Sequence, residues 1–435
     1  MISFWKQKPA NYHNDSENRR SDTLQVRETV LSSGTEELKD SSKEALEDAP
    51  VVEMVDLLLQ QAVSRDASDI HLEPTEKGLR VRLRVDGALS DFSPYSSEVM
   101  PLIISRLKIM AGMDIAERRL PQDGNIRIDV HNRPLNIRLS TLSTIYGEKM
   151  VLRLLNPEKI IMPIVNLGFS EENRKRYLKF LDNAYGMVLV TGPTGCGKTT
   201  TLYSTLHHVN NPAQNIITVE DPVEYRLDGI NQVQINPKIN LNFARALRTI
   251  LRQDPNVVMV GEIRDGETAE IATRAALTGH LVFSTLHTND APRAVTRLLD
   301  MGVEKFLLTS SLVGVVAQRL IRINCSECSE PYLPEKEELA FYRAAGGNNE
   351  SPVFTRGRGC EKCSFSGFRG RTAIHEVMPV DGEMRRMIME SCDTEEIMRY
   401  AISQGMRSLL QDGLQRASEG ITTVKEVMQV AYTVL

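Results

Sequence analysis

The chain has 435 residues, of which 41% are hydrophobic and 25% are charged, and its formal net charge is -5. A chain of this length can bury the cores of two or three domains. Its mildly acidic balance excludes a protein that attracts nucleic acid or anionic lipid through overall charge, although local basic surfaces stay possible. The composition indicates a soluble globular protein.

The amino terminus predicts neither a secretion signal nor a membrane anchor. The apolar character of MISFWKQK ends after Trp5, so the continuous apolar run of a signal peptide does not follow. The most apolar later stretch, FLLTSSLVGVVAQRL at residues 306–320, is interrupted by polar residues and is too short to span a bilayer. We therefore expect a cytoplasmic protein that reaches a membrane only through partners, with its six cysteines reduced and used for metal or packing.

Residues 1–157 divide into a tail and a first domain. Residues 1–48 are rich in polar and charged side chains that bury too little apolar surface to offset chain entropy, which predicts a flexible arm. From Val51, VVEMVDLLLQQAVSR has apolar residues at helical spacing, and a second helix is expected around MPLIISRLKIMAG. Apolar and polar residues alternate in GLRVRLRVDG, NIRIDV, PLNIRLS and EKMVLRLL, which predicts half-buried strands. These elements predict a small α+β domain over residues 49–157, followed by a linker over residues 158–167.

Residues 168–324 follow a different pattern. The short apolar runs GMVLVTG, IITVED, VVMVGEI and HLVFSTLHT alternate with helical segments, which favours a mainly parallel sheet covered on both faces. Functional groups of such a sheet gather at the carboxyl ends of its strands. The overall prediction is an α/β fold, with a cysteine-marked subdomain over residues 325–372 and a helical subdomain over residues 373–435.

The stretch GPTGCGKTT predicts a nucleotide site. It matches G-x-x-x-x-G-K-[ST] and lies between a strand-like and a helix-like segment, which is the context that this motif requires. Its glycines let backbone N–H groups approach phosphate oxygens, Lys198 can bridge the β- and γ-phosphates, and Thr199 is the expected magnesium ligand. A glycine-rich turn without a ligand is the alternative, and Cys196 occupies a variable position of the motif. The predicted nucleotide-binding residues of this stretch are Gly192, Pro193, Thr194, Gly195, Cys196, Gly197, Lys198, Thr199 and Thr200.

Acidic residues and a histidine follow three of the other strand-like runs. IITVED delivers Glu220 and Asp221 to a strand end, and VVMVGEI delivers Glu262. A P-loop enzyme needs one acid to hold magnesium, commonly through water, and one to polarise the attacking water; solvated loop carboxylates are the alternative. HLVFSTLHT ends in His287, which either contacts the γ-phosphate or is a satisfied core histidine.

Arginines form the remaining polar pattern of this domain. In LNFARALRTILRQDP, Arg245, Arg248 and Arg252 share one face of the expected helix. That face is either solvated or turned toward a phosphate of a neighbouring subunit, where an arginine accelerates phosphoryl transfer by ~10³ to 10⁵.

Two CxxC pairs predict a structural metal site. Cys325 and Cys328 form one pair, Cys360 and Cys363 form the other, and residues 329–359 between them form an excursion. Four thiolates suit tetrahedral zinc and leave no position open for catalysis; disulfides or free thiols are the alternatives. Cys392 stands alone and is expected to serve packing.

The motifs of residues 50–435 resemble those of the GspE/PilB family of secretion ATPases. The resemblance is carried by GPTGCGKTTTLY, ITVEDPVEY, the CxxC pairs and LRQDPNVVMVGEIRDGETAEIATRAALTGHLVFSTLHTNDA. It implies a RecA-like P-loop ATPase domain preceded by a PAS-like domain that contains SDIHLEP and LPQDGNIRI. It also implies a hexamer that converts the hydrolysis of Mg-ATP into movement of an inner-membrane platform protein, for type II secretion or type IV pilus assembly. The cysteine pairs favour an assembly ATPase over a pilus-retraction ATPase.

The resemblance assigns roles to further residues. The aspartate box of the family falls on Glu220, Asp221 and Glu224, its Walker B glutamate on Glu262, and its histidine box on His280 to His287. Its nucleotide-contacting arginines fall on Arg138, Arg153, Arg248 and Arg252. The first two belong to the first domain and would reach ATP only when that domain closes. The alternative is a RecA-like nucleic-acid motor, which would need stacking aromatics, yet aromatics make up only 5% of this chain.

Overall fold

The computed structural model describes residues 41–130, 133–155, 161–347, 349, 352–391 and 393–432. Residues 1–40 of the expected arm, the expected domain end at residues 156 and 157, the start of the expected linker and Cys392 lie outside this range. The chain divides into two units, residues 1–53 and 54–435. In the first unit the described residues belong to helix α1 (Ser41–Ser64), which begins ten residues before the helical pattern that Val51 opens.

The second unit begins with an antiparallel sheet of six strands in the order β3-β2-β1-β6-β5-β4. Its elements are β1 (Asp69–Thr75), β2 (Gly78–Val85), β3 (Ala88–Asp91), α2 (Met100–Met110), β4 (Gln122–Val130), β5 (Arg133–Thr144) and β6 (Gly147–Leu155). The alternation in β2 has the predicted effect, because Leu79, Val81 and Leu83 are buried. Two of the intervening arginines make ion pairs to neighbouring strands, Arg80 to Asp91 and Arg82 to Glu73. The basic face of β2 is therefore neutralised within the sheet.

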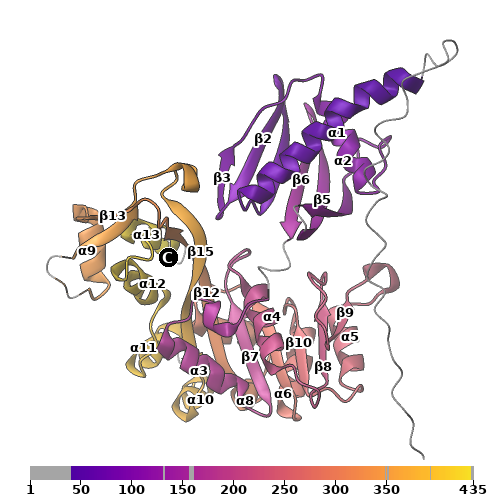
Figure 1. Ribbon diagram of the computed structural model, residues 1–435. Helices are drawn as coiled ribbons and strands as arrows, with labels where there is room; N and C mark the ends of the chain where they lie inside the picture. Colours follow the sequence, from indigo (N-terminus) through magenta and orange to yellow (C-terminus); the bar gives the residue numbers. More distant parts are fainter. Residues whose placement is uncertain are drawn as a thin grey trace, which may run out of the picture. The chain divides into compact units, whose positions relative to one another are not determined.

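A larger sheet of seven strands has the order β15-β12-β7-β11-β10-β8-β9 (Figure 1). All of its pairings are parallel except that between β12 and β15. Its strands are β7 (Gly186–Thr191), β8 (Ile216–Glu220), β9 (Asn231–Gln234), β10 (Val257–Val260), β11 (Leu281–Leu286), β12 (Leu312–Asn324) and β15 (Phe368–Pro379). The turn η2 (Ile164–Asn166) and helix α3 (Glu171–Leu181) precede β7. Between the strands lie the helices α4 (Lys198–Val209), α5 (Phe243–Ile250), α6 (Gly266–Leu277), α7 (Ala291–Asp300) and α8 (Lys305–Ser311), with the short 3-10 turn η3 (Pro237–Ile239).

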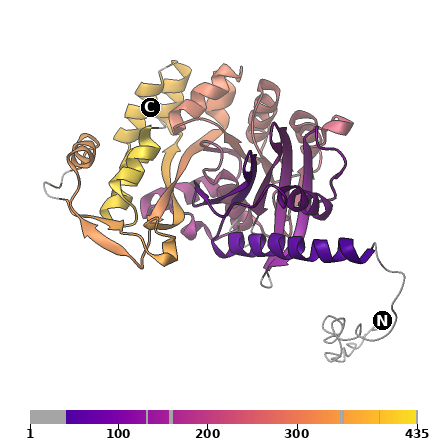
Figure 2. The same ribbon diagram turned by 90° about the horizontal axis from the view of Figure 1, so that it is seen from above.

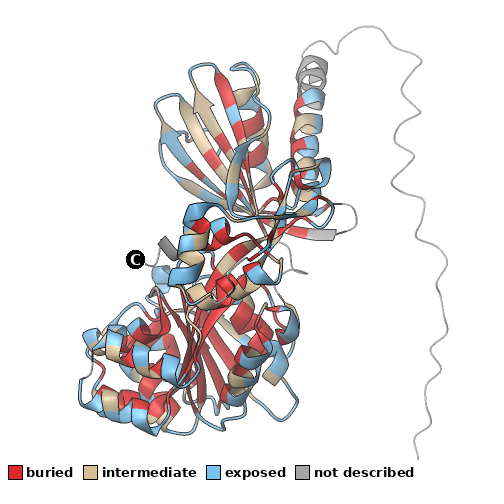
Figure 3. Ribbon diagram, turned by 90° about the vertical axis from the view of Figure 1, so that its left-hand side faces the viewer, coloured by how far each residue is buried: buried red, intermediate tan, exposed pale blue. Residues whose placement is uncertain are grey.

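Both faces of the inner strands of this sheet are buried, as Figure 3 shows by the red strands, whereas the edge strand β9 is partly exposed. Within β7, Met187 and Leu189 belong to one apolar cluster and Val188 and Val190 to another. The first cluster includes α5, α6, α7 and α8, and the second includes α3 and α4. A strand with helices on both sides needs apolar residues at every position, which explains the unbroken apolar runs in the sequence. The predicted α/β class is confirmed.

The described residues after β12 form a small hairpin, strand β15 of the larger sheet and five α-helices. Besides β15, their elements are β13 (Ser329–Tyr332), α9 (Lys336–Ala344), β14 (Phe354–Gly357), η4 (Glu361–Cys363), α10 (Gly382–Met389), α11 (Thr394–Ser403), α12 (Leu409–Ser418) and α13 (Val424–Tyr432). The helical expectation for residues 373–435 does not hold at its start, because residues 373–379 belong to β15. The run AIHEVM at residues 373–378 is buried on both faces beside β12, and α12 packs against β15 (Figure 2).

Candidate nucleotide site and cysteine cluster

The predicted P-loop connects the carboxyl end of β7 to the amino terminus of α4. Gly197 caps the helix with φ of +91°, and Gly192 and Gly195 have φ of +149° and +79°. These left-handed conformations suit glycine, because they lack steric cost only without a Cβ. The ammonium group of Lys198 lies in the curve of the loop and donates to the carbonyl oxygens of Gly192 (2.7 Å) and Pro193 (3.1 Å). Burial lowers the pKa of Lys198, and the charged groups around it do not reverse that shift.

Glu262 and His287 come together at the ends of β10 and β11. Glu262 Oε2 lies 3.4 Å from His287 Nε2, and Glu262 Oε1 lies 2.5 Å from Arg264 Nη2. Partial burial acts to raise the pKa of Glu262, but Arg264 and His287 outweigh it, so the pKa stays below its ordinary value. Glu262 also interacts electrostatically with Lys198 of the P-loop. An ionised carboxylate therefore stands beside the predicted phosphate site.

Hydrogen bonds between strand ends hold this arrangement in place. The Thr191 hydroxyl, at the end of β7, accepts from the Thr288 backbone N–H at 2.8 Å. The Thr285 hydroxyl, in β11, donates to the Gly261 carbonyl oxygen at 2.8 Å. His287 is thus fixed between two strand ends, one of which begins the P-loop and the other of which precedes Glu262. It is half-exposed and is not a buried core histidine.

Glu220 and Asp221 occupy different environments although they are adjacent. The Glu220 carboxylate is buried and accepts hydrogen bonds from Tyr203 (2.5 Å), Thr218 (2.5 Å) and Gln232 (3.1 Å). Asp221 is exposed and raises the pKa of Arg264 as one of several contributions, led by the hydrogen bond to Glu262. Asp221 therefore faces the group of acidic and basic side chains at Glu262, whereas Glu220 is held within α4, β8 and β9. A catalytic role of either residue stays a prediction.

Arg138 and Arg153 lie opposite each other in the register of β5 and β6. Arg138 pairs with Glu224 at 2.8 Å and donates to the Val223 carbonyl oxygen at 3.0 Å. Arg153 pairs with the buried Asp69 at 3.0 Å, and its side chain is 62% exposed. Since the two residues are register partners, both guanidinium groups lie on the same face of the sheet, and each makes an ion pair with an acidic side chain. Contact with a nucleotide stays a prediction for both.

Arg248 and Arg252 are not brought to the P-loop of their own chain. Arg248 pairs with Glu267 of α6 at 2.5 Å, and Arg252 donates to the Arg248 carbonyl oxygen at 2.7 Å. Helix α5 ends at Ile250, so Arg252 lies just beyond the helix that the sequence pattern predicts to contain it. Helix α5 packs on β8 and α6, and β10 and β11 separate β8 from β7.

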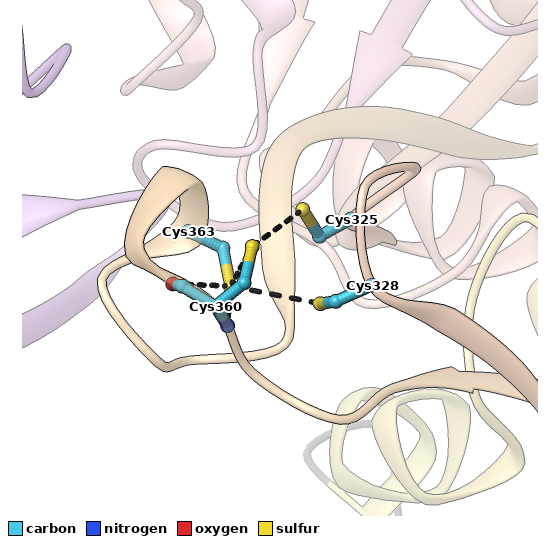
Figure 4. A group of neighbouring side chains, drawn as sticks. All are labelled: Cys325, Cys328, Cys360 and Cys363. Carbon is cyan, nitrogen blue, oxygen red and sulfur yellow. Dashed lines mark hydrogen bonds between the residues drawn. The ribbon is translucent and has the colours of Figure 1, made fainter.

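The four cysteines of the CxxC pairs form one cluster (Figure 4). Their sulfur atoms all lie within 4.8 Å of one another, with Sγ···Sγ distances of 3.9 Å for Cys325 and Cys360, 3.9 Å for Cys328 and Cys363, and 3.8 Å for Cys360 and Cys363. A tetrahedral zinc site with Zn–S bonds of about 2.3 Å has S···S edges of about 3.8 Å. The sulfur atoms are therefore spaced as zinc ligands are.

Backbone N–H groups donate to two sulfur atoms of the cluster and favour the thiolate form of Cys363. The Cys363 sulfur accepts from the N–H groups of Cys360 (3.2 Å) and Gly367 (3.3 Å), and the Cys328 sulfur accepts from Gly359 (3.3 Å). Desolvation acts to raise the pKa of Cys363, yet the N–H groups of Cys360 and Gly367, together with the neighbouring thiols, hold it at about 6. Desolvation and the neighbouring thiols raise the pKa of Cys328 despite the Gly359 N–H, so without a metal the negative charge is favoured on Cys363. Such outer contacts orient and stabilise metal-bound thiolates.

Several polar residues near the P-loop were not singled out from the sequence. Arg264 borders Glu262, and Gln318 and Arg319 lie buried in β12. Arg319 donates to Asn289 at 3.0 Å, while its Nε and Nη1 have no hydrogen-bond partner among the described residues. The only sequence indication of Gln318 and Arg319 was a polar pair inside an otherwise apolar run.

A P-loop at the end of a parallel strand, with a carboxylate and a histidine at the neighbouring strand ends, defines a P-loop NTP-binding protein. The profile of the family described as Type II/IV secretion system protein matches residues 44–429. The type II secretion system protein E of Pseudomonas aeruginosa is 50% identical over 384 residues, which cover 88% of this chain and 76% of that protein. The type IV pilus assembly ATPase PilB of Myxococcus xanthus is 48% identical over 402 residues, which cover 92% of this chain and 71% of that protein.

Solved structures agree with this match. The pilus retraction motor PilT with bound ADP aligns with a TM-score of 0.57 and 26% identity, covering 86% of this chain and 96% of that chain. The ATPase DotB of Legionella pneumophila aligns with a TM-score of 0.65 at 20% identity over 87% of this chain and 95% of that chain, which shows a shared fold. The chain belongs to the Type II/IV secretion system protein family and is an ATPase, and its resemblance to the GspE/PilB ATPases is confirmed. None of the helices in the described ranges has the length and apolar character needed to cross a bilayer.

Proposed function

We propose that this ATPase works as a homohexamer and uses magnesium-dependent ATP hydrolysis to move an inner-membrane platform protein in type II secretion or type IV pilus assembly. The observation that carries the proposal is the meeting of the P-loop with Glu262 and His287 at one edge of the larger sheet. The relatives support both systems, since a type II secretion protein E and a PilB protein are 50% and 48% identical to the chain. We propose a cytoplasmic location, with attachment to the membrane through that partner.

The site residues divide the work of hydrolysis. Lys198 and the loop N–H groups bind the phosphates of ATP, and Thr199 and Asp221 hold magnesium, Asp221 through water. Magnesium, when bound, neutralises charge that develops on the phosphates. Glu262 orients and polarises the attacking water, and His287 contacts the γ-phosphate and holds the Glu262 carboxylate toward it.

The arginines complete the site from elsewhere in the assembly. Arg248 and Arg252 are exposed on the outer side of α5 and its end, a position that suits contact with a nucleotide of a neighbouring subunit. Arg138 and Arg153 exchange their acidic partners for phosphate oxygens when the first domain closes. Charge-assisted contacts of this kind stabilise the transition state of phosphoryl transfer.

The cysteine cluster is proposed to hold one structural zinc ion. The sulfur spacing and the backbone donors to Cys328 and Cys363 support this assignment. We also propose the division of the chain that the sequence predicts: an arm, a PAS-like first domain, a linker, a RecA-like ATPase domain and the two carboxyl-terminal subdomains. The antiparallel pairing of β12 with β15 supports a close connection between the ATPase domain and the start of the last subdomain.

Steady-state ATP hydrolysis by the purified full chain tests the function. We expect Lys198→Ala to abolish hydrolysis and Glu262→Gln to lower kcat by about 10² to 10⁴, the range for loss of a general base. Lys175→Ala and Glu270→Gln are matched controls, because both residues are exposed and pair only along their own helices with Glu171 and Arg274. Hydrolysis by Lys198→Ala at the wild-type rate would show that the P-loop assignment is wrong.

Two additions to this assay test the finer parts of the proposal. The rate per chain is expected to rise with protein concentration as hexamers form, which light scattering can follow. Single-stranded DNA is expected to have no effect, and strong, salt-sensitive stimulation by it would instead favour a nucleic-acid motor.

A further inference from the structure

Gln318 of β12 makes two hydrogen bonds to the P-loop region through its side-chain amide. Its Nε2 donates to the Cys196 carbonyl oxygen at 2.8 Å, and its Oε1 accepts from the Thr201 hydroxyl at 2.7 Å. All four groups are buried, so water does not compete for them. Since the Thr201 donor occupies the amide oxygen, the amide nitrogen is turned toward the loop.

The bond to Cys196 fixes the direction of the following N–H group. A trans peptide unit is planar, and its C=O and N–H point in opposite directions. The Cys196 carbonyl and the Gly197 N–H belong to one such unit. When Gln318 holds the carbonyl on the β12 side, the Gly197 N–H must face the other side, away from β12. A phosphate loop works by presenting N–H groups to its ligand, so the orientation of this peptide matters for binding.

The glycines of the loop pack directly on Gln318. A Cβ on Gly192 would stand 2.5 Å from the Gln318 carbonyl oxygen, and a Cβ on Gly197 would stand 2.8 Å from Gln318 Nε2. Carbon atoms do not approach oxygen or nitrogen this closely, and both glycines have φ in the left-handed range. The first and sixth residues of the motif therefore need to be glycine partly because Gln318 lies against them.

The register of β12 in the sheet fixes the position of Gln318 relative to the P-loop. Ala317 is the last residue of β12 in register with β7, opposite Thr191, so Gln318 is the first residue beyond the end of β7. On its other edge, β12 stays paired with β15, where Gln318 lies opposite His375. A side chain anchored in the middle of a paired strand has little freedom to follow a loop that moves.

We propose that Gln318 is a positioning residue that holds the Cys196–Gly197 peptide in the phosphate-binding orientation. The inference rests on the proposed ATPase site and adds to it the residue that preorganises its loop. Without the Gln318 amide the Cys196–Gly197 peptide would populate other orientations. The apparent dissociation constant for the nucleotide then rises in inverse proportion to the fraction of molecules whose loop is in the phosphate-binding orientation. At saturating nucleotide, binding draws all molecules into the phosphate-binding orientation of the loop, so kcat should change little.

The test is the variant Gln318→Met, which keeps the length of the side chain and removes both hydrogen bonds. We expect KM for ATP and Kd for ADP to rise about tenfold, equivalent to about 1.4 kcal/mol, with kcat within about twofold of wild type. A purely structural role would lower the active fraction, and thus kcat, at unchanged KM. Unchanged KM and Kd, or a loss in kcat alone, would overturn the proposal.

A second pair of variants gives a matched comparison and decides the question if Gln318→Met does not fold. Thr201 and Thr273 are both fully buried helix threonines, but the Thr201 hydroxyl donates to Gln318 and the Thr273 hydroxyl donates to its own helix at Ala269. Thr201→Val is expected to raise KM for ATP and Thr273→Val to leave it unchanged. Equal KM values for the two variants would overturn the proposal. Failure of the wild-type chain to hydrolyse ATP, in contrast, would count against the proposed function and not against this residue.

Discussion

Two neighbouring residues of β15 are expected to give the stability of the chain opposite dependences on pH. The His375 ring stacks on Phe169 with 3.8 Å between ring centroids, and burial, aided by Arg416, lowers its pKa from 6.5 to about 3. Burial raises the pKa of Glu376 from 4.5 to about 7, although its carboxylate accepts hydrogen bonds from the backbone N–H groups of Ala291 and Leu409. The folded chain therefore holds His375 neutral and Glu376 protonated in mildly acidic solution.

The two contributions have opposite signs. The lowered pKa of His375 contributes stability that is present above pH 6.5 and is lost as the pH falls toward about 3. The raised pKa of Glu376 contributes stability that is present below pH 4.5 and is lost as the pH rises through about 7. Between pH 4.5 and 6.5 the unfolded chain holds one proton at this pair, on His375, and the folded chain holds one, on Glu376. The pair then contributes no pH dependence, because the proton counts are equal.

Single substitutions should expose each contribution. With His375→Phe, which keeps a ring against Phe169, the free energy of unfolding should rise as the pH falls, by at most about 1.4 kcal/mol per pH unit. With Glu376→Gln it should fall by a similar amount, so the slopes of the two variants differ by at most about 2.7 kcal/mol per pH unit. Other titrating groups add the same slope to both variants and cancel in this difference.

Urea unfolding followed by far-ultraviolet circular dichroism between about pH 5 and 6 measures these slopes. Wild type should lie between the two variants in slope at every pH of the series. Parallel lines for His375→Phe and Glu376→Gln would refute the reasoning, whatever the absolute stabilities.

Two further predictions concern a buried ion pair and the cysteine cluster. Lys108 of α2 and Glu148 of β6 form a buried ion pair at 2.5 Å. Lys108→Met should therefore lower the free energy of unfolding by about 3 to 5 kcal/mol, because it leaves the Glu148 charge buried without a partner, and adding Glu148→Gln should recover much of that loss. Equal stability of the single and double variants would contradict this. Elemental analysis of the purified chain should find one zinc ion per chain. The variant Cys360→Ser should not retain zinc, because apparent metal-binding free energy on the order of 10 kcal/mol depends on the complete ligand set. Wild-type protein that is free of metal after preparation without chelator would count against the site.

The sequence was informative wherever one local pattern determines structure. The P-loop motif, the buried strands around it and the CxxC pairs depend on short-range chemistry, and each lies in the structure where the pattern indicates. What the sequence did not contain is the register between distant segments. The register of β5 with β6 places Arg138 opposite Arg153. The register of β7 with β12 places Gln318 at the end of β7. Periodicity also misplaced Arg252, because α5 ends two residues before it.

The environment of Glu220 shows a second limit. Its position after IITV made it equivalent to Glu262 in the sequence, since both follow a buried strand. In the structure the hydroxyl of Tyr203, from the middle of α4, reaches the Glu220 carboxylate at 2.5 Å, whereas Glu262 meets His287 and Arg264. No rule of strand-end position distinguishes the two, because the difference arises from which helix and which neighbouring strand end lie beside each carboxylate.

Strand β12 connects the P-loop to the cysteine cluster. Gln318 contacts the P-loop, and six residues further along the same strand Asn324 precedes the first cysteine of the cluster. Between them Arg322 pairs with Glu426 of α13 and lies over the Phe368 ring, 4.1 Å from its centroid. Asn324 donates to the Gly420 carbonyl oxygen at 3.0 Å, which joins the strand end to the turn before α13. Between these two points β12 is paired with β15, with a shift of register between Arg322 and Asn324, so the strand that supports the P-loop also leads to the cysteine cluster. The two CxxC pairs are far apart in the sequence because one follows the end of β12 and the other precedes the start of β15. The cluster therefore holds together the neighbouring ends of two paired strands, and the middle of one of these strands, at Gln318, contacts the P-loop.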